Sequence, residues 1–302
     1  MTRFDPAWLD VQYNNRARIP EHPQIFERWA MASARVREGM TSVLDIAYGD
    51  GPNETLDVFP AVQGGSPVFV FLHGGWWRSL DKSDHSFLAA SLVGAGAMVV
   101  LPNYALCPGT EAQPVSIETI ALQTVHALAW VYRNAARYGG RPGRIVVAGH
   151  SAGAHLAAMM LCCDWQDVAA DLPARVVHSA LAISGVFDLE PVRQTPFLQA
   201  DLRLTPESVD RLSPAYFRKP TGPLVAAVGA LESEEFLRQN QLIQQAWGIP
   251  TVPVCETIAG ANHLTVLHDL ADPDGRLHRL ALGLLDLVRV NPEKQRAPMA
   301  SH

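Results

Sequence analysis

The chain has 302 residues, of which 48% are hydrophobic and 18% are charged, and its formal net charge is −6. This composition is typical of a globular protein with a sizeable core. An acidic chain without a run of lysine or arginine is not expected to bind nucleic acid or an anionic membrane surface. No apolar run approaches the roughly 20 residues of a membrane span. With no apolar leader at the N-terminus and no paired cysteine motif, a cytoplasmic protein with reduced thiols is predicted.

The first third of the chain predicts helices, then a hairpin, then a buried strand. Residues 1–45 are mostly helical in pattern, because apolar residues recur at helical spacing in "PEHPQIFERWAMASARVREG". The alternating stretches "SVLDIAYG" and "ETLDVFPA" flank the turn "DGPNE" and predict a hairpin. A buried strand at 67–75, a helix at 84–96 and a strand at 97–104 follow.

The remainder alternates regularly between helix and strand. Helices are predicted at 116–140, from Ala152 onward, at 235–248 and at 275–290, and strands at 144–151, 175–188, 222–231 and 252–260. The central strands are continuous apolar runs, which indicates a mainly parallel sheet with helices on both faces. We therefore expect an α/β fold with a single domain over 1–290. Residues 1–45 form its helical N-terminal extension, 189–217 a small helical cap or lid insertion, and 291–302 a disordered tail.

A serine stands at the tip of a sharp strand-to-helix turn. The sequence "RIVVAGHSAGAHLAAMML" reads as a buried strand, a Gly-rich turn and an Ala-rich helix. "GHSAG" fits the G-x-S-x-G nucleophile elbow, in which a strained turn exposes the serine hydroxyl above the sheet. Gly149 and Gly153 leave room for the neighbouring backbones, and the helix that follows favours a negative oxygen. Ser151 is therefore the candidate nucleophile.

A second Gly-rich turn, "FLHGGWW", follows an earlier strand. Acyl transfer needs backbone N–H groups where the carbonyl oxygen becomes negative. The predicted oxyanion hole is made of Gly74, Gly75, Trp76 and Ala152, with the amides of Gly75, Trp76 and Ala152 as donors. Gly74 and His73 shape the turn.

A serine needs a base, and the order Ser, acid, His places that base after the last strand. "TIAGANHLTVLHD" offers His263 and His268, and His263 is preferred because His268 falls in the next helix. His150 and His155 flank the serine, and the elbow is expected to turn their side chains away from the site.

The acid should follow the preceding strand in "PLVAAVGALESEEF". Glu232 comes first after the strand and is preferred. Glu234 and Glu235 remain alternatives, although acidic residues at these positions also suit the start of a helix.

With these motifs in hand, the chain resembles the α/β-hydrolases, and within them the arylformamidases and the hormone-sensitive-lipase-like esterases. The likeness extends from "LDIAYGDGPNETLDVF" through "HGGWWRSLDKS", "NYALCP" and "GHSAGAHLAA" to "VGALESEEFLRQ" and "ANHLTVL". The resemblance implies that Ser151 is the nucleophile, Glu232 the triad acid and His263 the base. Glu232 departs from the family, in which aspartate is expected at this position.

The resemblance implies a serine hydrolase that cleaves small aryl formamides of the N-formylkynurenine type, or carboxylic esters, through an acyl-enzyme. No cofactor and no metal are expected, and the expected partner is a small aromatic substrate. Alternatives are an amidase or carbamate hydrolase with a bulkier acyl group, and a non-catalytic binding homologue. Trp76, Trp77 and Phe187 are candidate substrate-binding residues, with Phe197 and Tyr216 as further pocket candidates. Arg78 and Arg193 are candidates for binding a substrate carboxylate.

Overall fold

An eight-stranded sheet forms the centre of the computed structural model, which describes residues 5–287. The strand order is β1-β2-β4-β3-β5-β6-β7-β8. β1 pairs antiparallel with β2, β2 pairs antiparallel with β4, and the remaining pairs are parallel. The strands are β1 (Val43–Ala47), β2 (Thr55–Phe59), β3 (Ser66–Leu72), β4 (Met98–Pro102), β5 (Gly140–His150), β6 (Val177–Ile183), β7 (Leu224–Gly229) and β8 (Val254–Ile258).

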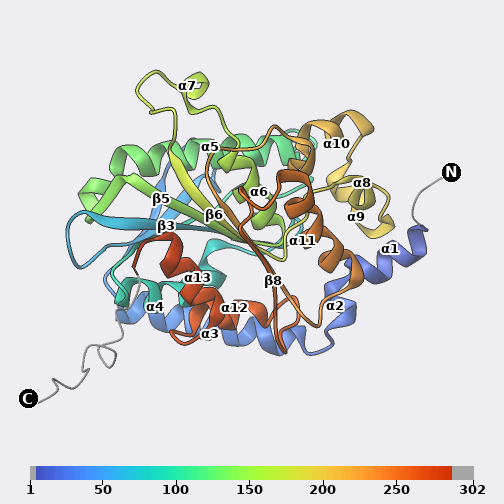
Figure 1. Cartoon of the computed structure of the whole chain (residues 1–302), viewed down its shortest axis with the longest axis horizontal. Coiled ribbons are helices and arrows are strands. Elements are labelled where there is room, and N and C mark those ends of the chain that lie inside the picture. Colours follow the sequence, from blue (N-terminus) through green and yellow to red (C-terminus); the bar gives the residue numbers. More distant parts are fainter. Residues whose placement is uncertain (1–4, 288–302) are drawn as a thin grey trace, which may run out of the picture.

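Helices cover both faces of the sheet (Figure 1). The longer ones are α1 (Pro6–Tyr13), α3 (His22–Gly39), α5 (Ile117–Asn134), α6 (Ala152–Leu161), α11 (Glu234–Trp247) and α13 (Arg276–Leu284). The shorter ones are α2 (Asn15–Arg18), α4 (Ala89–Gly94), α7 (Trp165–Val168), α8 (Glu190–Arg193), α9 (Pro196–Leu202), α10 (Pro206–Leu212) and α12 (Val266–Ala271). Three 3₁₀ helices are η1 (Lys82–Leu88), η2 (Ala135–Tyr138) and η3 (Pro214–Tyr216).

The buried side chains form two clusters, one on each face of the sheet. β3 shows the division, because Val68, Val70 and Leu72 pack in the cluster with α5, α6 and α11. Phe69 and Phe71 point to the other face, where they pack with α3, α4, α12 and α13. All seven residues of β3 are buried, which explains why its sequence is a continuous apolar run rather than an alternating one.

The predicted fold class is confirmed: the sheet is mainly parallel, with helices on both faces, and the hairpin before it is β1–β2. The helix expected at 84–96 is wrong in part, since residues 82–88 form η1 and the α-helix begins at Ala89. The predicted tail at 291–302 lies outside the described residues. Within residues 5–287, no helix is long and apolar enough to cross a lipid bilayer.

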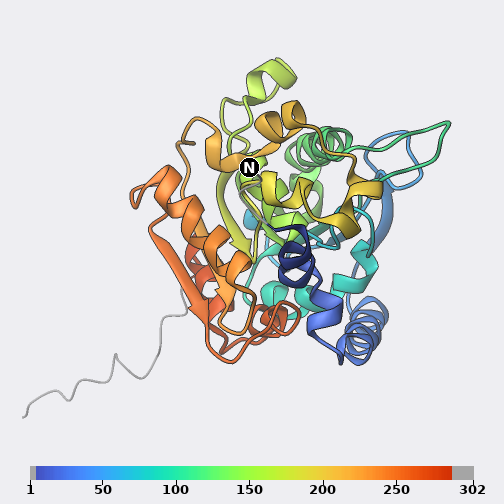
Figure 2. The ribbon, with the colours of Figure 1, turned by 90° about the vertical axis from the view of Figure 1, so that its right-hand side faces the viewer.

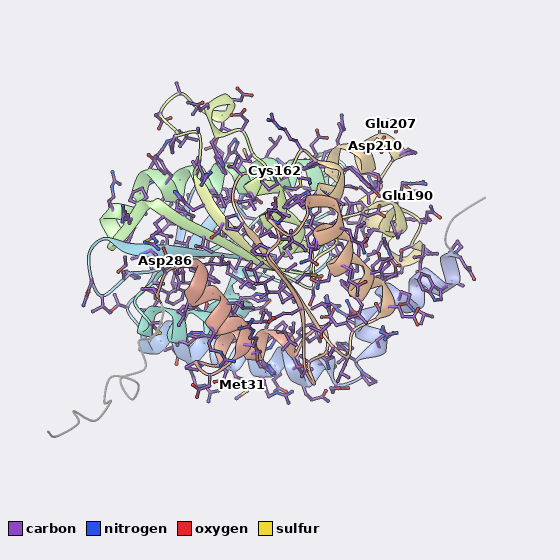
Figure 3. The ribbon with its side chains drawn as sticks, in the orientation of Figure 1. Met31, Cys162, Glu190, Glu207, Asp210 and Asp286 are labelled. Atoms are coloured by element: carbon purple, nitrogen blue, oxygen red, sulfur yellow. The ribbon has the colours of Figure 1, made fainter. Side chains whose placement is uncertain are left out.

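The N-terminal helices and the insertion lie at the same end of the molecule. Figure 2 shows α1 beside the short helices of the insertion, and α1 contacts α8, α9 and α11. The acidic residues labelled on this insertion in Figure 3, Glu190, Glu207 and Asp210, belong to α8 and α10. In a parallel sheet, loops at the carboxyl ends of the strands meet at one edge, so this end is where a site is expected.

Candidate active site

Ser151 occupies the sharp turn between β5 and α6. Its backbone angles, φ 56° and ψ −119°, lie in a region that side-chain-bearing residues rarely adopt. The turn requires two glycines, because a Cβ on Gly149 would lie 2.1 Å from the oxygen of Gly153, and one on Gly153 would lie 2.0 Å from the oxygen of Leu72. The Ser151 amide donates a 2.8 Å hydrogen bond to Ile183 of β6, which fixes the turn to the sheet.

His263 and Glu232 are in direct contact at the ends of the next strands. His263 Nδ1 lies 2.6 Å from Glu232 Oε2, and both side chains are buried. The other carboxylate oxygen, Oε1, accepts from Ser184 Oγ at 2.5 Å and from the Gly229 amide at 2.7 Å. The carboxylate therefore holds the Nδ1 proton of His263, which leaves Nε2 as the nitrogen that can accept a proton.

The alternative acids and the alternative histidine do not take part in this contact. Glu235 accepts from Tyr13 Oη at 2.8 Å and pairs with Arg238. Glu234 is exposed in the first turn of α11. His268, in α12, accepts from Trp29 Nε1 at 3.1 Å. Among the candidates raised by the sequence, the structure brings together Glu232 and His263.

The predicted orientation of the His150 side chain is wrong. The elbow was expected to turn its side chain away, but His150 lines the same cavity as Ser151. Its ring centroid lies 4.6 Å from that of His263, and its Nε2 lies 2.7 Å from the backbone oxygen of His263. Burial, with the neighbouring His263 ring, lowers the pKa of His150 well below its usual range. His155 does point away, into contact with the oxygen of Leu212 at 2.6 Å.

The turn that contains Gly74, Gly75 and Trp76 packs directly on the elbow. Gly75 has φ 102° and Trp76 φ 55°, and a Cβ on Gly74 would lie 2.8 Å from the oxygen of His150. The backbone amides of Gly75 and Trp76 have no acceptor among the described residues. Ala152 is the first residue of α6, so its amide lies among the N–H groups that a helix leaves without an intrahelical partner.

His73 holds this turn from behind. Its Nε2 lies 3.0 Å from Asn103 Oδ1, and its Nδ1 lies 2.8 Å from the oxygen of Gly74. Tyr104 stacks on the His73 ring at 4.2 Å and donates to the His73 carbonyl at 2.7 Å. Burial lowers the pKa of His73 to about 4, so the ring is neutral at pH 7. These contacts fit a structural role for His73.

Ser151 and His263 face a cavity of about 490 Å³, a volume suited to a small organic molecule. Its aromatic wall is formed by Phe26, Trp29, Trp76 and Phe197. Its polar wall is formed by Asn14, Asn15, Arg16, Arg78, Ser79 and Asp201, and the remaining lining residues are Gly75, Leu80, Cys107, Pro108, His150 and Leu264. Within residues 5–287, no group of three or more His, Cys, Asp or Glu residues is arranged to hold a metal ion.

Two of the expected substrate-binding residues do not line this cavity. Trp77 is completely buried and packs edge-on against His155, with ring centroids 5.0 Å apart. Phe187 is also completely buried, in the core beside Gln239. Both are corrected to core residues, whereas Trp76 lines the cavity, as Phe197 does. Tyr216 is exposed, and the cavity lining does not include it.

The two arginines proposed from the sequence are already paired. Arg193 binds Glu190 and lies outside the cavity. Arg78 lines the cavity but binds the Asp201 carboxylate, and its guanidinium lies 5.4 Å from the centre of the Phe197 ring. The sequence did not indicate Asn15 and Arg16, which reach the cavity from α2. The segment "NNRAR" between two short helices carries no motif that would have indicated this role.

The family model described as BD-FAE matches residues 56–203. Kynurenine formamidase of Danio rerio is 29% identical over 260 residues, which cover 83% of this chain and 84% of that protein. Carboxylesterase NlhH of Mycobacterium tuberculosis is 42% identical over 102 residues, which cover 33% of this chain and 30% of that protein.

Solved structures have the same fold. A crystal structure of a protein from Silicibacter sp. TM1040 matches with a TM-score of 0.78 and 29% identity, covering 89% of this chain and 97% of that one. The carboxylesterase EstE1 from a metagenomic library matches with a TM-score of 0.64 and 20% identity, covering 93% and 95%. The fold is that of the α/β-hydrolases, the similarities point to the branch of the arylformamidases and hormone-sensitive-lipase-like esterases, and the chain is an enzyme that hydrolyses esters or amides.

Proposed function

We propose that this enzyme hydrolyses small aryl formamides of the N-formylkynurenine type, and small aryl esters, with Ser151 as nucleophile, His263 as base and Glu232 as the acid that orients the base. The observation that carries the proposal is the 2.6 Å contact between Glu232 and His263 beside the cavity that Ser151 lines. A carboxylate on Nδ1 selects the tautomer in which Nε2 can take the serine proton.

The first half of the reaction forms a formyl-enzyme. Ser151 Oγ attacks the formyl carbon, and its proton passes to His263 Nε2. The carbonyl electron pair moves onto oxygen, where the amides of Gly75, Trp76 and Ala152 stabilise it. When the tetrahedral intermediate collapses, the C–N bond breaks and His263 returns the proton to the leaving amine nitrogen.

The second half releases formate. A water molecule loses a proton to His263 as its oxygen bonds to the formyl carbon. Collapse of this intermediate breaks the ester bond to Ser151, and the proton on His263 returns to Ser151 Oγ. Each half uses the same oxyanion donors, and water is the second reactant besides the substrate.

The cavity wall supports an aromatic substrate. Phe26, Trp29, Trp76 and Phe197 offer ring surface on which an aryl group can pack. The similarity to kynurenine formamidase of Danio rerio, which extends over 83% of this chain, supports the formamide. The similarity to carboxylesterase NlhH supports a second candidate, a carboxylesterase that does not prefer formamides.

Paired steady-state kinetics distinguish the two candidates. N-formyl-L-kynurenine and p-nitrophenyl acetate are compared with the wild type and with Ser151→Ala. A higher kcat/KM for the formamide, lost in the variant, is the expected result. Strong ester turnover with little formamide turnover would favour the carboxylesterase, and full activity of Ser151→Ala on both substrates would refute the nucleophile.

An acyl series tests the alternative of a bulkier acyl group. Formyl, acetyl and butyryl anilides of one aromatic amine differ only in the methylenes beside the scissile carbonyl. A formamidase should lose kcat/KM as the acyl group grows, because added methylenes need space near the elbow. A rate that rises from formyl to butyryl would assign the enzyme to amides with larger acyl groups.

A further inference from the structure

The cavity lining has two arginines but one carboxylate, so positive charge is in excess. Of the described lining residues, Asp201 alone carries a carboxylate, and Arg78 binds it. Arg78 is also held by the backbone oxygen of Phe197, at 3.2 Å. Arg16 lines the same cavity and makes no ion pair with any described residue. Arg16 is exposed, so one guanidinium at the solvent side of the cavity has no counter-charge among the described residues.

Arg16 is held beside the oxyanion turn by weak contacts. Its Nη2 donates to Ser79 Oγ at 3.4 Å, and Ser79 Oγ donates in turn to the oxygen of Gly75 at 3.0 Å. The guanidinium carbon lies 5.6 Å from the centre of the Phe26 ring. These contacts orient the guanidinium but leave most of its five N–H donors unused, so it can bind a carboxylate through two parallel hydrogen bonds.

Asn15, the residue before Arg16, has a side chain with unused hydrogen-bonding groups. Asn15 is only 9% exposed, yet its side-chain amide makes no hydrogen bond to a described residue. Asn15 and His263 together line both the main cavity and a smaller one of about 210 Å³. The Asn15 amide atoms are not among the fully buried polar atoms, so they are accessible from these cavities and offer two donors and an acceptor to a ligand beside His263.

The segment that carries these two residues is fixed to the body of the enzyme. Tyr13 Oη donates to Glu235 at 2.8 Å, and the Tyr13 ring packs edge-on against Trp76 with centroids 5.4 Å apart. Gln12 accepts from the Glu235 amide at 3.3 Å. Burial, together with the Glu235 charge, raises the pKa of Tyr13 well above its usual range, so the phenol remains a neutral donor.

We propose that Asn15 and Arg16 form a subsite that binds a carboxylate on the leaving part of the substrate, with Arg16 as the residue that selects substrates with this carboxylate over substrates without it. The subsite deepens the proposed function and rests on it for the bond that is cleaved. The carboxylate lies far from the reacting atoms in such a substrate. Arg16 therefore contributes the same binding to the ground state and the transition state, which lowers KM without changing kcat.

The experiment compares two substrates that differ in one carboxylate, N-formyl-L-kynurenine and N-formylkynuramine, with the wild type, Arg16→Gln, Arg16→Lys and Arg35→Gln. Arg35 is exposed in α3 and lines neither of the two cavities, so Arg35→Gln controls for the loss of one positive charge. We expect Arg16→Gln to raise KM for the carboxylate substrate about tenfold with little change in kcat, the loss typical of one charged contact. N-formylkynuramine should be unaffected, Arg16→Lys should recover part of the loss, and Arg35→Gln should match the wild type.

Equal effects of Arg16→Gln on both substrates, or no effect on either, would overturn the subsite. A second measurement does not need turnover: L-kynurenine and kynuramine are titrated calorimetrically into Ser151→Ala, with and without Arg16→Gln. L-kynurenine should bind more tightly, and Arg16→Gln should remove the difference. Equal affinities in Ser151→Ala, or no binding, would refute the subsite. A preference for L-kynurenine without any turnover of the formamide by the wild type would instead refute the proposed function alone.

Discussion

Ser184 Oγ donates a 2.5 Å hydrogen bond to Oε1 of Glu232, the carboxylate whose other oxygen contacts His263. Ser184 directly follows β6, has a left-handed conformation with φ 53°, and is completely buried. The left-handed backbone after β6 places the Ser184 hydroxyl against Glu232, which follows the neighbouring strand β7. In the proposed mechanism, Ser184 acts on the reaction through Glu232 and is a positioning residue.

Ser184→Ala should lower kcat about tenfold and leave KM nearly unchanged, because Glu232 loses one of its two fixed donors and orients His263 less well. The matched control is Ser233→Ala, which removes the hydroxyl that caps α11 one residue from Glu232. That variant should cost about 1 kcal/mol of folding free energy with kcat unchanged. If both variants lower kcat alike, the effect of Ser184 is general destabilisation and the positioning role is wrong.

His150 should be needed to hold the loop of His263. His150→Phe keeps a buried ring but leaves the oxygen of His263 without its donor, so kcat should fall at least tenfold and the melting temperature should drop. His150→Gln retains a side-chain donor and should restore part of both. Activity measured across pH 5 to 9, with circular dichroism melts, separates the effects. Wild-type kcat in His150→Phe would contradict this role.

Gly75 should not tolerate a side chain. Its φ is 102°, and a Cβ would lie 2.2 Å from the backbone oxygen of Ser79, so Gly75→Ala must deform the turn that supplies two oxyanion donors. We expect kcat to fall at least a hundredfold, about 3 kcal/mol of transition-state stabilisation. Gly64→Ala is the control, because a Cβ there meets no atom within 4 Å. Comparable activity of the two variants would show that the turn is not part of the site.

The folded enzyme should lose stability below neutral pH. Burial lowers the pKa values of His73, His85 and His155 to about 4, whereas the unfolded chain has the ordinary value near 6.5. Between these values the unfolded chain binds more protons, so stability is complete above about pH 6.5 and is lost as pH falls toward about 4. Each buried histidine adds up to about 1.4 kcal/mol for each pH unit in that window.

Urea unfolding at pH 7, 6 and 5 measures this slope. His155→Gln should flatten it, because one group that titrates only in the unfolded chain is removed. The exposed residue His126 provides the control, and His126→Gln should leave the slope unchanged. A slope that is identical in wild type and His155→Gln would show that His155 does not contribute.

The sequence pattern was sufficient to predict structure where residues close together in the chain determine it. The elbow could be predicted because the apolar run before Ser151, the two glycines and the Ala-rich helix lie within 18 residues. The order of strands indicated that the histidine and acid come late. The pattern could not decide among Glu232, Glu234 and Glu235, because that choice depends on donors from Gly229 and from Ser184, a residue of another strand end.

The walls of the cavity were hard to predict because long-range contacts determine them. Arg16 belongs to a segment that is held by long-range contacts, such as the hydrogen bond from Tyr13 to Glu235, 222 positions away in the chain. Trp76 and Trp77 are adjacent and share φ 55°, yet one lines the cavity and the other packs on His155. No periodicity in the sequence distinguishes the two tryptophans.

The main cavity is assembled from two kinds of segment. The proposed reacting groups Ser151 and His263 follow strands of the sheet, whereas much of the wall comes from α2, from the turn at 75–80 and from α9. Natural divergence and laboratory evolution can therefore change the residues of the cavity wall while Ser151 and His263 stay in place. A mutant library confined to residues 14–16 and 197–201 would search for new substrates without rebuilding the catalyst, and a graft of these segments between relatives would transfer preference rather than chemistry.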